Sequence, residues 1–326
     1  MAAADQIKSL IKSFADNDES RFYATAMQIA ASEARNGHKA VAEELKKIID
    51  KAKSEKSLNL GVVKVLPQNS AQKELKDLLE LSHPKEKLKD MVLKPELEKS
   101  LKRVLDEQRK TELLRQNNLF PRKKLLFVGP SGTGKTMSAS VLASELGLPL
   151  FVIRLDGLIS RYMGESISKL RLIFDAMYQM KAVYLFDEFD SIGSNRTSAN
   201  DLGEIKRVLN TFLMQIEKDN SSSLIIAATN LPEQLDKALF RRFDDIINYP
   251  YPNRKEILKL LKRELLELRK SVALDLDKIA LGTDGLSFAE IHRICEDITK
   301  DFLVYGVNEV SEEKILSYAK MRKQPY

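Results

Sequence analysis

Apolar residues in the middle of the chain come in short runs, and longer amphipathic stretches separate them. Five runs have the length and composition of strands, over residues 125–128, 150–155, 183–187, 224–228 and 245–249. The stretches between them repeat their apolar residues at helical spacing. Such alternation is typical of a parallel sheet with helices on both faces. The pattern therefore predicts an α/β core over residues 84–250 with a five-stranded parallel sheet.

Both ends of the chain show helical patterns only. Residues 1–55 carry apolar residues at helical spacing, such as Leu10 and Phe14, and predict a small three-helix N-terminal unit. This unit serves as an adaptor or as an oligomerisation element, and the sequence leaves both alternatives open. Residues 56–83 are mixed in character and predict a linker. Residues 251–326 follow two prolines and predict a helical C-terminal lid.

Composition excludes several classes of protein. With 43% hydrophobic and 31% charged residues, the chain has the make-up of a soluble globular protein, and no apolar run is long enough to span a bilayer. The net charge of +6 is spread along the chain, which makes nucleic acid an unfavoured partner. The start of the chain has no secretory pattern, and the one cysteine, Cys295, fits a reducing compartment. We therefore expect a cytoplasmic protein in which Cys295 has a packing role.

A phosphate-binding pattern follows the first predicted strand of the core. It reads G-x-x-x-x-G-K-[ST] and comprises Gly129, Pro130, Ser131, Gly132, Thr133, Gly134, Lys135 and Thr136, with Met137 next at the start of a helical stretch. Backbone N–H groups of such a loop wrap a polyphosphate. Lys135 can reach the β- and γ-phosphates, and the Thr136 hydroxyl can ligate Mg²⁺. The strand before and the helix after disfavour a mere surface loop, so we expect ATP and Mg²⁺ as ligands.

Two adjacent acids end the apolar run at residues 183–187. Asp187 and Glu188 should lie at the carboxyl edge of the sheet, beside the phosphate loop. Asp187 can hold the Mg²⁺ shell, and Glu188 can orient or deprotonate an attacking water. Together these motifs predict an enzyme that hydrolyses ATP.

These elements resemble the AAA family of ATPases, and the likeness runs from about residue 84 to about residue 300. The strand that ends in Asn230 is similar to the family's sensor strand, which implies that Asn230 polarises the water or reports phosphate loss. The adjacent Arg241 and Arg242 resemble the family's arginine fingers, with the spacing of the microtubule-severing members katanin and spastin. In the family such arginines reach the next subunit's nucleotide. The resemblance thus implies a homo-hexameric ring, and it leaves open which arginine is the principal finger.

Further motifs of the resemblance concern the adenine and the substrate. Residues 90–92 lie where the family's adenine pocket often begins, and residues 285–291 look like its lid motif, with Phe288 in place of a small residue. Tyr162 and Met163 resemble the family's pore loop, which grips an extended polypeptide. The resemblance therefore implies a ring that remodels or unfolds a protein substrate by threading.

Two other functions stay open. One is a DNA-directed ATPase, such as an initiator or transposition helper, and the other is a regulatory ATPase that signals nucleotide state to a partner enzyme. The chain has three histidines and no H-E-x-x-H pair, so any protease partner would be separately encoded.

Overall fold

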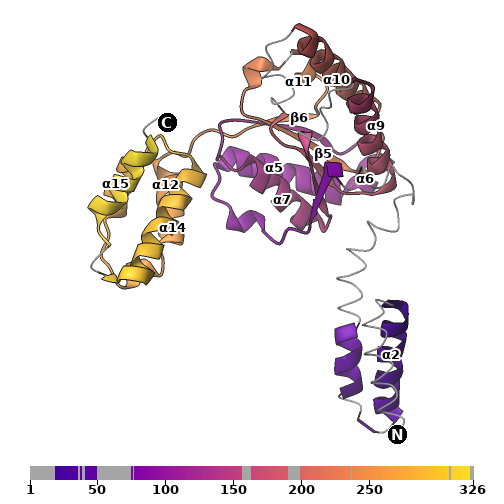
Figure 1. Ribbon diagram of the computed structural model, residues 1–326, viewed down its shortest axis with the longest axis horizontal. Coiled ribbons are helices and arrows are strands. Elements are labelled where there is room, and N and C mark those ends of the chain that lie inside the picture. The colour runs from indigo at the N-terminus through magenta and orange to yellow at the C-terminus, as the bar shows by residue number, and fades with distance from the viewer. Residues whose placement is uncertain are drawn as a thin grey trace. The chain divides into compact units, whose positions relative to one another are not determined.

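The structure, a computed structural model, describes residues 19–35, 37–38, 41–49, 75, 77–155, 163–189, 199–235, 237–307 and 310–323. The chain divides into two compact units, residues 1–67 and residues 68–326 (Figure 1). Within the described residues, no helix combines the length and the apolar character that crossing a membrane requires.

The described part of the first unit is helical. It contains α2 (Glu19–Arg35) and a second helical segment over residues 41–49. Ala30 of α2 and Ala42 and Ile49 of the second segment are buried. Both helices were predicted from the spacing of apolar residues, and the expected first helix, around Leu10 and Phe14, lies outside the described residues.

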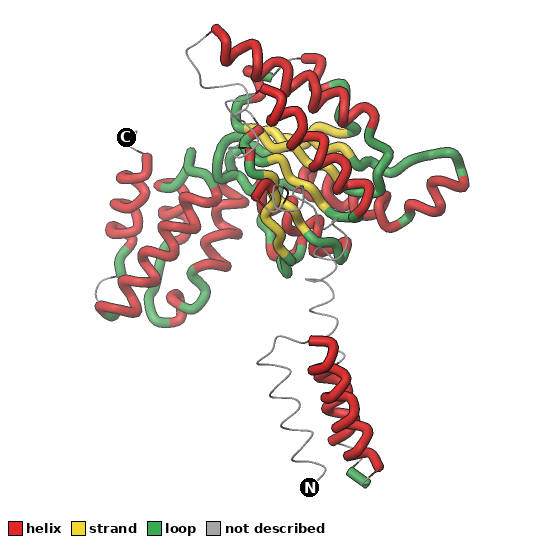
Figure 2. The backbone as a smooth tube through the Cα atoms, turned by 45° about the vertical axis from the view of Figure 1, so that its right-hand side comes forward, coloured by secondary structure: helices red, strands yellow, loops and turns green. Residues whose placement is uncertain are grey.

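The second unit is built on one sheet of six strands in the order β1-β3-β4-β5-β2-β6. The strands, drawn in yellow in Figure 2, are β1 (Leu79–Ser82), β2 (Lys124–Val128), β3 (Leu150–Ile153), β4 (Val183–Phe186), β5 (Leu224–Thr229) and β6 (Asp245–Asn248). Strands β2 to β6 pair in parallel with one another. The predicted five parallel strands are therefore confirmed.

The sixth strand, β1, corrects the predicted strand count. It pairs antiparallel with β3, with Leu79 opposite Ile153, and forms an edge of the sheet. The strand falls within residues 56–83, which the sequence predicted as a linker. Its four residues alternate between half-buried and exposed, so they lack the continuous apolar run by which the central strands were found.

Helices cover both faces of the sheet because every residue of the central strand β4 is buried (Figure 1). On one face lie α5 (Pro95–Arg109) and α7 (Lys135–Leu146), which pack on Leu125, Phe127 and their neighbours. The short helices η1 (Leu88–Asp90) and α6 (Thr111–Gln116) flank α5 in the chain.

On the other face lie α9 (Met163–Gln179) and α10 (Ala199–Lys218). Phe212 of α10 packs its ring edge-on against Phe186 of β4, at 4.8 Å between ring centroids. Two short helices, η3 (Pro232–Gln234) and α11 (Lys237–Phe240), connect β5 to β6.

The C-terminal part of the second unit is helical, as predicted, and has its own core. It comprises α12 (Arg254–Glu264), η4 (Leu268–Lys270), α13 (Leu276–Gly282), α14 (Phe288–Tyr305) and α15 (Glu312–Lys323). Cys295 of α14 belongs to this core, and burial raises the pKa of its thiol to about 12. The thiol is therefore neutral at ordinary pH, and the expected packing role of Cys295 is confirmed.

Candidate active site

The residues that the sequence singled out meet at one edge of the sheet because three neighbouring parallel strands end there. Strands β4, β5 and β2 are adjacent in the sheet order. The phosphate loop follows β2, Asp187 follows β4 and Asn230 follows β5. Ligand sites of open α/β sheets lie outside the carboxyl ends of the strands. The topology therefore places these three groups together.

Two glycines of the phosphate loop hold backbone conformations that exclude a side chain. Gly129 has a φ of +154°, and a Cβ there would lie 2.1 Å from the carbonyl oxygen of Tyr249. Gly132 has a φ of +73°, and a Cβ there would lie 2.5 Å from the Ser287 hydroxyl. Because glycine adopts such conformations without steric cost, the loop can turn tightly between β2 and α7.

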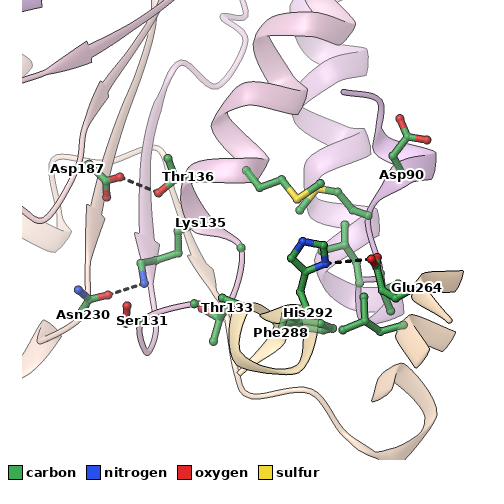
Figure 3. A pocket seen from close by; sticks show the side chains of 18 of the residues that line it. Asp90, Ser131, Thr133, Lys135, Thr136, Asp187, Asn230, Glu264, Phe288 and His292 are labelled. Carbon is green, nitrogen blue, oxygen red and sulfur yellow. Dashed lines mark hydrogen bonds and ion pairs between the residues drawn. The ribbon is translucent and has the colours of Figure 1, made fainter. Parts of the chain in front are cut away.

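The ammonium group of Lys135 is held by three oxygen atoms. It donates to the carbonyl oxygens of Gly129 at 2.7 Å and Pro130 at 2.8 Å, and to the side-chain oxygen of Asn230 at 2.6 Å (Figure 3). The side chain is buried, with 7% of the residue exposed. These contacts fix the charged end of Lys135 between the phosphate loop and the end of β5.

A hydroxyl and a carboxylate meet beside this lysine. Thr136 donates from its hydroxyl to Asp187 Oδ2 at 2.7 Å (Figure 3). The backbone N–H of Glu188 donates to Asp187 Oδ1 at 3.0 Å. Glu188 itself has a φ of +49°, a left-handed conformation that costs a residue with a side chain about 1–2 kcal/mol. The chain thus turns sharply just after the strand and separates the two acids.

A cavity of about 430 Å³ extends from this group of residues. Its phosphate-loop end is lined by residues 131–137, Asp187, Glu188 and Asn230. The rest of its wall comes from a core segment and from two helices of the C-terminal part, namely from Asp90, Met91, Val92, Leu93, Leu260, Arg263, Glu264, Phe288, Ala289 and His292 (Figure 3). The segment at residues 90–92 and Phe288 were both expected near the adenine, and both line this cavity.

Four of the cavity residues were not predicted from the sequence. Leu260, Arg263 and Glu264 lie on α12, and His292 lies one helical turn beyond the lid motif on α14. His292 Nδ1 lies 3.0 Å from Glu264 Oε2, and the Arg263 guanidinium donates to the backbone carbonyl of Asp90. The three histidines of the chain are isolated in sequence, so only the packing of α12 on α14 could identify this pair.

The lid motif begins α14 and contacts the phosphate loop. Ser287 caps the helix by accepting from the backbone N–H of Glu290 at 3.3 Å, and the Glu290 carboxylate accepts from the N–H of Ser287 at 2.7 Å. The N–H of Ala289 donates to the carbonyl oxygen of Gly132 at 3.0 Å. A shift of the α14 N-terminus would therefore be felt directly by the phosphate loop.

The two arginines after α11 stand apart from the cavity. Arg241 is exposed, whereas Arg242 is half-buried and its Nε lies 3.3 Å from Glu217 Oε2 of α10. Neither residue lines the cavity. Tyr162 lies outside the described residues, and Met163 is the first residue of α9. The roles expected for these residues remain predictions.

Known proteins similar to the chain belong to one family. Residues 125–251 match the ATPase family associated with various cellular activities (AAA). A protein of Sinorhizobium fredii, "Uncharacterized AAA family ATPase y4kL", is 33% identical over 313 residues, which are 96% of this chain and 93% of that protein. A katanin p60 ATPase-containing protein of Rattus norvegicus is 36% identical over 214 residues, which are 63% of this chain and 44% of that protein.

The fold is also that of a solved structure. The crystal structure of the FIGL-1 AAA domain superposes with a TM-score of 0.60, at 22% identity, covering 78% of this chain and 89% of that chain. At this identity the likeness shows the fold, whereas the near full-length match to the S. fredii protein shows the family. The phosphate loop, the cavity and these similarities lead to one conclusion: the chain belongs to the AAA family of ATPases.

Proposed function

We propose that the cavity binds ATP with Mg²⁺ and that the residues at its phosphate-loop end carry out hydrolysis. The observation that carries this proposal is the junction of Lys135 with Asn230 and of Thr136 with Asp187 at one end of the cavity. Backbone N–H groups of residues 131–136 and the N-terminus of α7 would bind the phosphates, and Lys135 would bridge the β- and γ-phosphates.

The Thr136–Asp187 pair fits a magnesium ion. Mg²⁺ prefers oxygen ligands, and at phosphate sites it takes one or two from the protein and the rest from water and phosphate. No group of three or more His, Cys, Asp or Glu side chains among the described residues could form a cage around a metal. A site made of one hydroxyl, one carboxylate and the nucleotide phosphates agrees with that preference. The bound ion would neutralise charge that develops on the phosphates.

Glu188 and Asn230 would act on the attacking water. Both line the phosphate-loop end of the cavity. Glu188 would accept a proton from the water or orient it toward the γ-phosphate. Lysine is a donor only, so the carbonyl side of the Asn230 amide must face Lys135, and its NH₂ group is turned elsewhere. That NH₂ group would donate to the water or to the γ-phosphate.

Arg241 and Arg242 would complete the site of a neighbouring subunit. Both lie outside the cavity of their own chain, and an arginine finger supplied by another subunit raises hydrolysis by about 10³–10⁵. Glu217 engages Arg242, whereas Arg241 is exposed, so we assign the principal finger to Arg241. This role requires a closed assembly, for which we propose a homo-hexameric ring. Arg241→Ala should then reduce hydrolysis more than Arg242→Ala does.

The ring would remodel or unfold a protein substrate by threading. This part of the proposal rests on the aromatic-hydrophobic-glycine pattern at Tyr162 and Met163, and on membership of the AAA family. The N-terminal helices would recruit the substrate or a partner, which includes a separately encoded protease. We place the protein in the cytoplasm, since its single cysteine, Cys295, is a buried thiol.

The threading proposal is tested in two steps. The Glu188→Gln variant, incubated with ATP, is used to isolate a bound protein. Wild type, Tyr162→Ala and the control Tyr305→Ala, which alters an exposed tyrosine of α14, are then compared for ATP-dependent exposure of that protein to a protease. We expect Tyr162→Ala alone to keep ATP hydrolysis and lose unfolding. Unfolding that survives in Tyr162→Ala would reject threading, and DNA-stimulated, salt-sensitive hydrolysis would favour a DNA-directed ATPase.

A further inference from the structure

A hydrogen-bonded network closes the cavity on the side of the C-terminal helices. The Glu264 carboxylate accepts from Arg263 Nη2 at 2.8 Å and Nε at 3.1 Å through Oε1, and its Oε2 lies 3.0 Å from His292 Nδ1. Another nitrogen of the same guanidinium, Nη1, donates to the carbonyl oxygen of Asp90. The network therefore ties α12 and α14 to the core segment at residues 88–93, where the adenine is expected.

His292 is placed to meet a ligand in the cavity. Its side chain is 49% exposed, whereas that of Glu264 is 18% exposed. Both residues line the cavity, and Figure 3 shows Glu264 at one ring nitrogen of His292 and the other nitrogen turned away from it. The Glu296 carboxylate is 3.9 Å from this second nitrogen, Nε2, which is too far for a hydrogen bond. Nε2 can therefore bond to a group that enters the cavity.

The partner of Nδ1 decides what Nε2 can bind. An ionised carboxylate only accepts, so Nδ1 carries the proton that faces Glu264. In a neutral imidazole the other nitrogen is then an acceptor. Arg263 holds the carboxylate in place, which fixes this tautomer. We propose that His292 is a specificity-determining residue of the ATPase, whose Nε2 accepts a hydrogen bond from a donor group on the nucleoside half of the bound nucleotide.

The donor has two possible sources on ATP, and this inference rests on the proposed ATP site. One source is the 6-amino group of adenine, which guanine and hypoxanthine replace with a carbonyl oxygen that cannot donate. The other is a ribose hydroxyl. A hydrogen bond of this kind changes affinity by about three- to tenfold. The two sources predict different analogue preferences, so binding measurements separate them.

The test uses nucleoside diphosphates, whose binding does not depend on the proposed hydrolytic roles. Calorimetry on the full chain, at mildly alkaline pH where an imidazole is neutral in water, gives dissociation constants for ADP, inosine diphosphate, purine riboside diphosphate and 2′- and 3′-deoxy-ADP. We compare wild type, His292→Ala and the control Arg293→Ala, an exposed neighbour on α14. Wild type and Arg293→Ala should prefer ADP by about three- to tenfold over the analogues that lack the donor.

His292→Ala should lose that preference and bind the poorer analogues as well as wild type does. Loss of the preference against inosine and purine riboside diphosphates identifies the 6-amino group, and loss against a deoxy analogue identifies the ribose. An equal weakening of every ligand, or no change, would overturn the inference and leave the ATP site standing. Failure of wild type to bind any diphosphate would overturn the ATP site as well.

Glu264→Gln tests the tautomer itself with an isosteric change. Arg263 still requires an acceptor, so the glutamine oxygen should face Arg263 and its NH₂ group should face His292. Nδ1 must then accept, and Nε2 becomes a donor. If adenine is the source, this variant should bind inosine diphosphate at least as well as ADP. If ribose is the source, the preference should persist, because a hydroxyl also accepts. A 6-amino preference that survives Glu264→Gln would contradict the tautomer assignment.

Discussion

The side-chain nitrogen of Lys135 lies 2.6 Å from the side-chain oxygen of Asn230. This contact joins the phosphate loop after β2 to the end of the neighbouring strand β5. It orients the amide of Asn230, because a lysine can only donate. The two residues therefore act as one unit at the phosphate-loop end of the cavity.

Asn230→Ala should slow hydrolysis much more than it weakens nucleotide binding. The amide NH₂ group would be lost from the water or the γ-phosphate, and such losses reduce kcat by about tenfold or more. Steady-state ATP hydrolysis should show a large fall in kcat with a smaller change in KM. Glu233→Ala, an exposed change three residues away, serves as the control. A variant with normal kcat would remove Asn230 from the proposed chemistry.

Glu188→Gln should bind ATP and hydrolyse it about 10²–10⁴ times more slowly, since the amide cannot accept the proton of the water. Equilibrium binding and single-turnover hydrolysis measure the two properties separately. The change keeps the size of the side chain, so the left-handed backbone at this position should be equally tolerated. Substantial turnover in the variant would contradict the role assigned to Glu188.

Thr136→Val should raise the Mg²⁺ concentration required for half-maximal hydrolysis. Valine has the shape of threonine but lacks the hydroxyl that lies 2.7 Å from Asp187. The expected shift is about tenfold or more, because one of two protein ligands is lost. Titration of Mg²⁺ at saturating ATP gives the value, and removal of Mg²⁺ with a chelator should abolish hydrolysis in wild type. An unchanged Mg²⁺ requirement would mean that Thr136 does not ligate the ion.

Gly132→Ala should weaken ATP binding through the contact between the phosphate loop and α14. The added Cβ would lie 2.5 Å from the Ser287 hydroxyl and 3.0 Å from Ala289 Cβ, so the N-terminus of α14 must move. Gly147→Ala is the matched control, because its φ of +65° gives similar backbone strain and its Cβ meets nothing within 4 Å. Both variants should lose about 1 kcal/mol of stability in urea unfolding from that strain.

Only Gly132→Ala should raise the KM for ATP, by about tenfold, because a wall of the cavity is displaced. Equal KM values in the two variants would show that the contact between the loop and α14 does not affect binding.

Much of the site could be predicted because its residues adjoin strands. Lys135, Asp187 and Asn230 each follow an apolar run, and the topology of a parallel sheet brings the ends of such runs together. Glu264 and His292 carry no such local signal. They lie 28 residues apart on two helices, and only the tertiary packing of α12 on α14 makes them neighbours. Strand β1 was missed for a related reason, since an edge strand of four residues needs its partner β3 to be recognised.

The central claim is that a neighbouring subunit completes the ATPase site, and mixing two inactive variants tests it most directly. Lys135→Ala removes the lysine from the subunit's own site, and the Arg241→Ala/Arg242→Ala double variant removes the arginines offered to its neighbour. Each should be nearly inactive alone. In randomly mixed rings about one interface in four pairs an intact lysine with an intact arginine, so hydrolysis should recover to at most about a quarter of wild type. Mixed assemblies whose activity never exceeds the sum of the separate variants would contradict the claim.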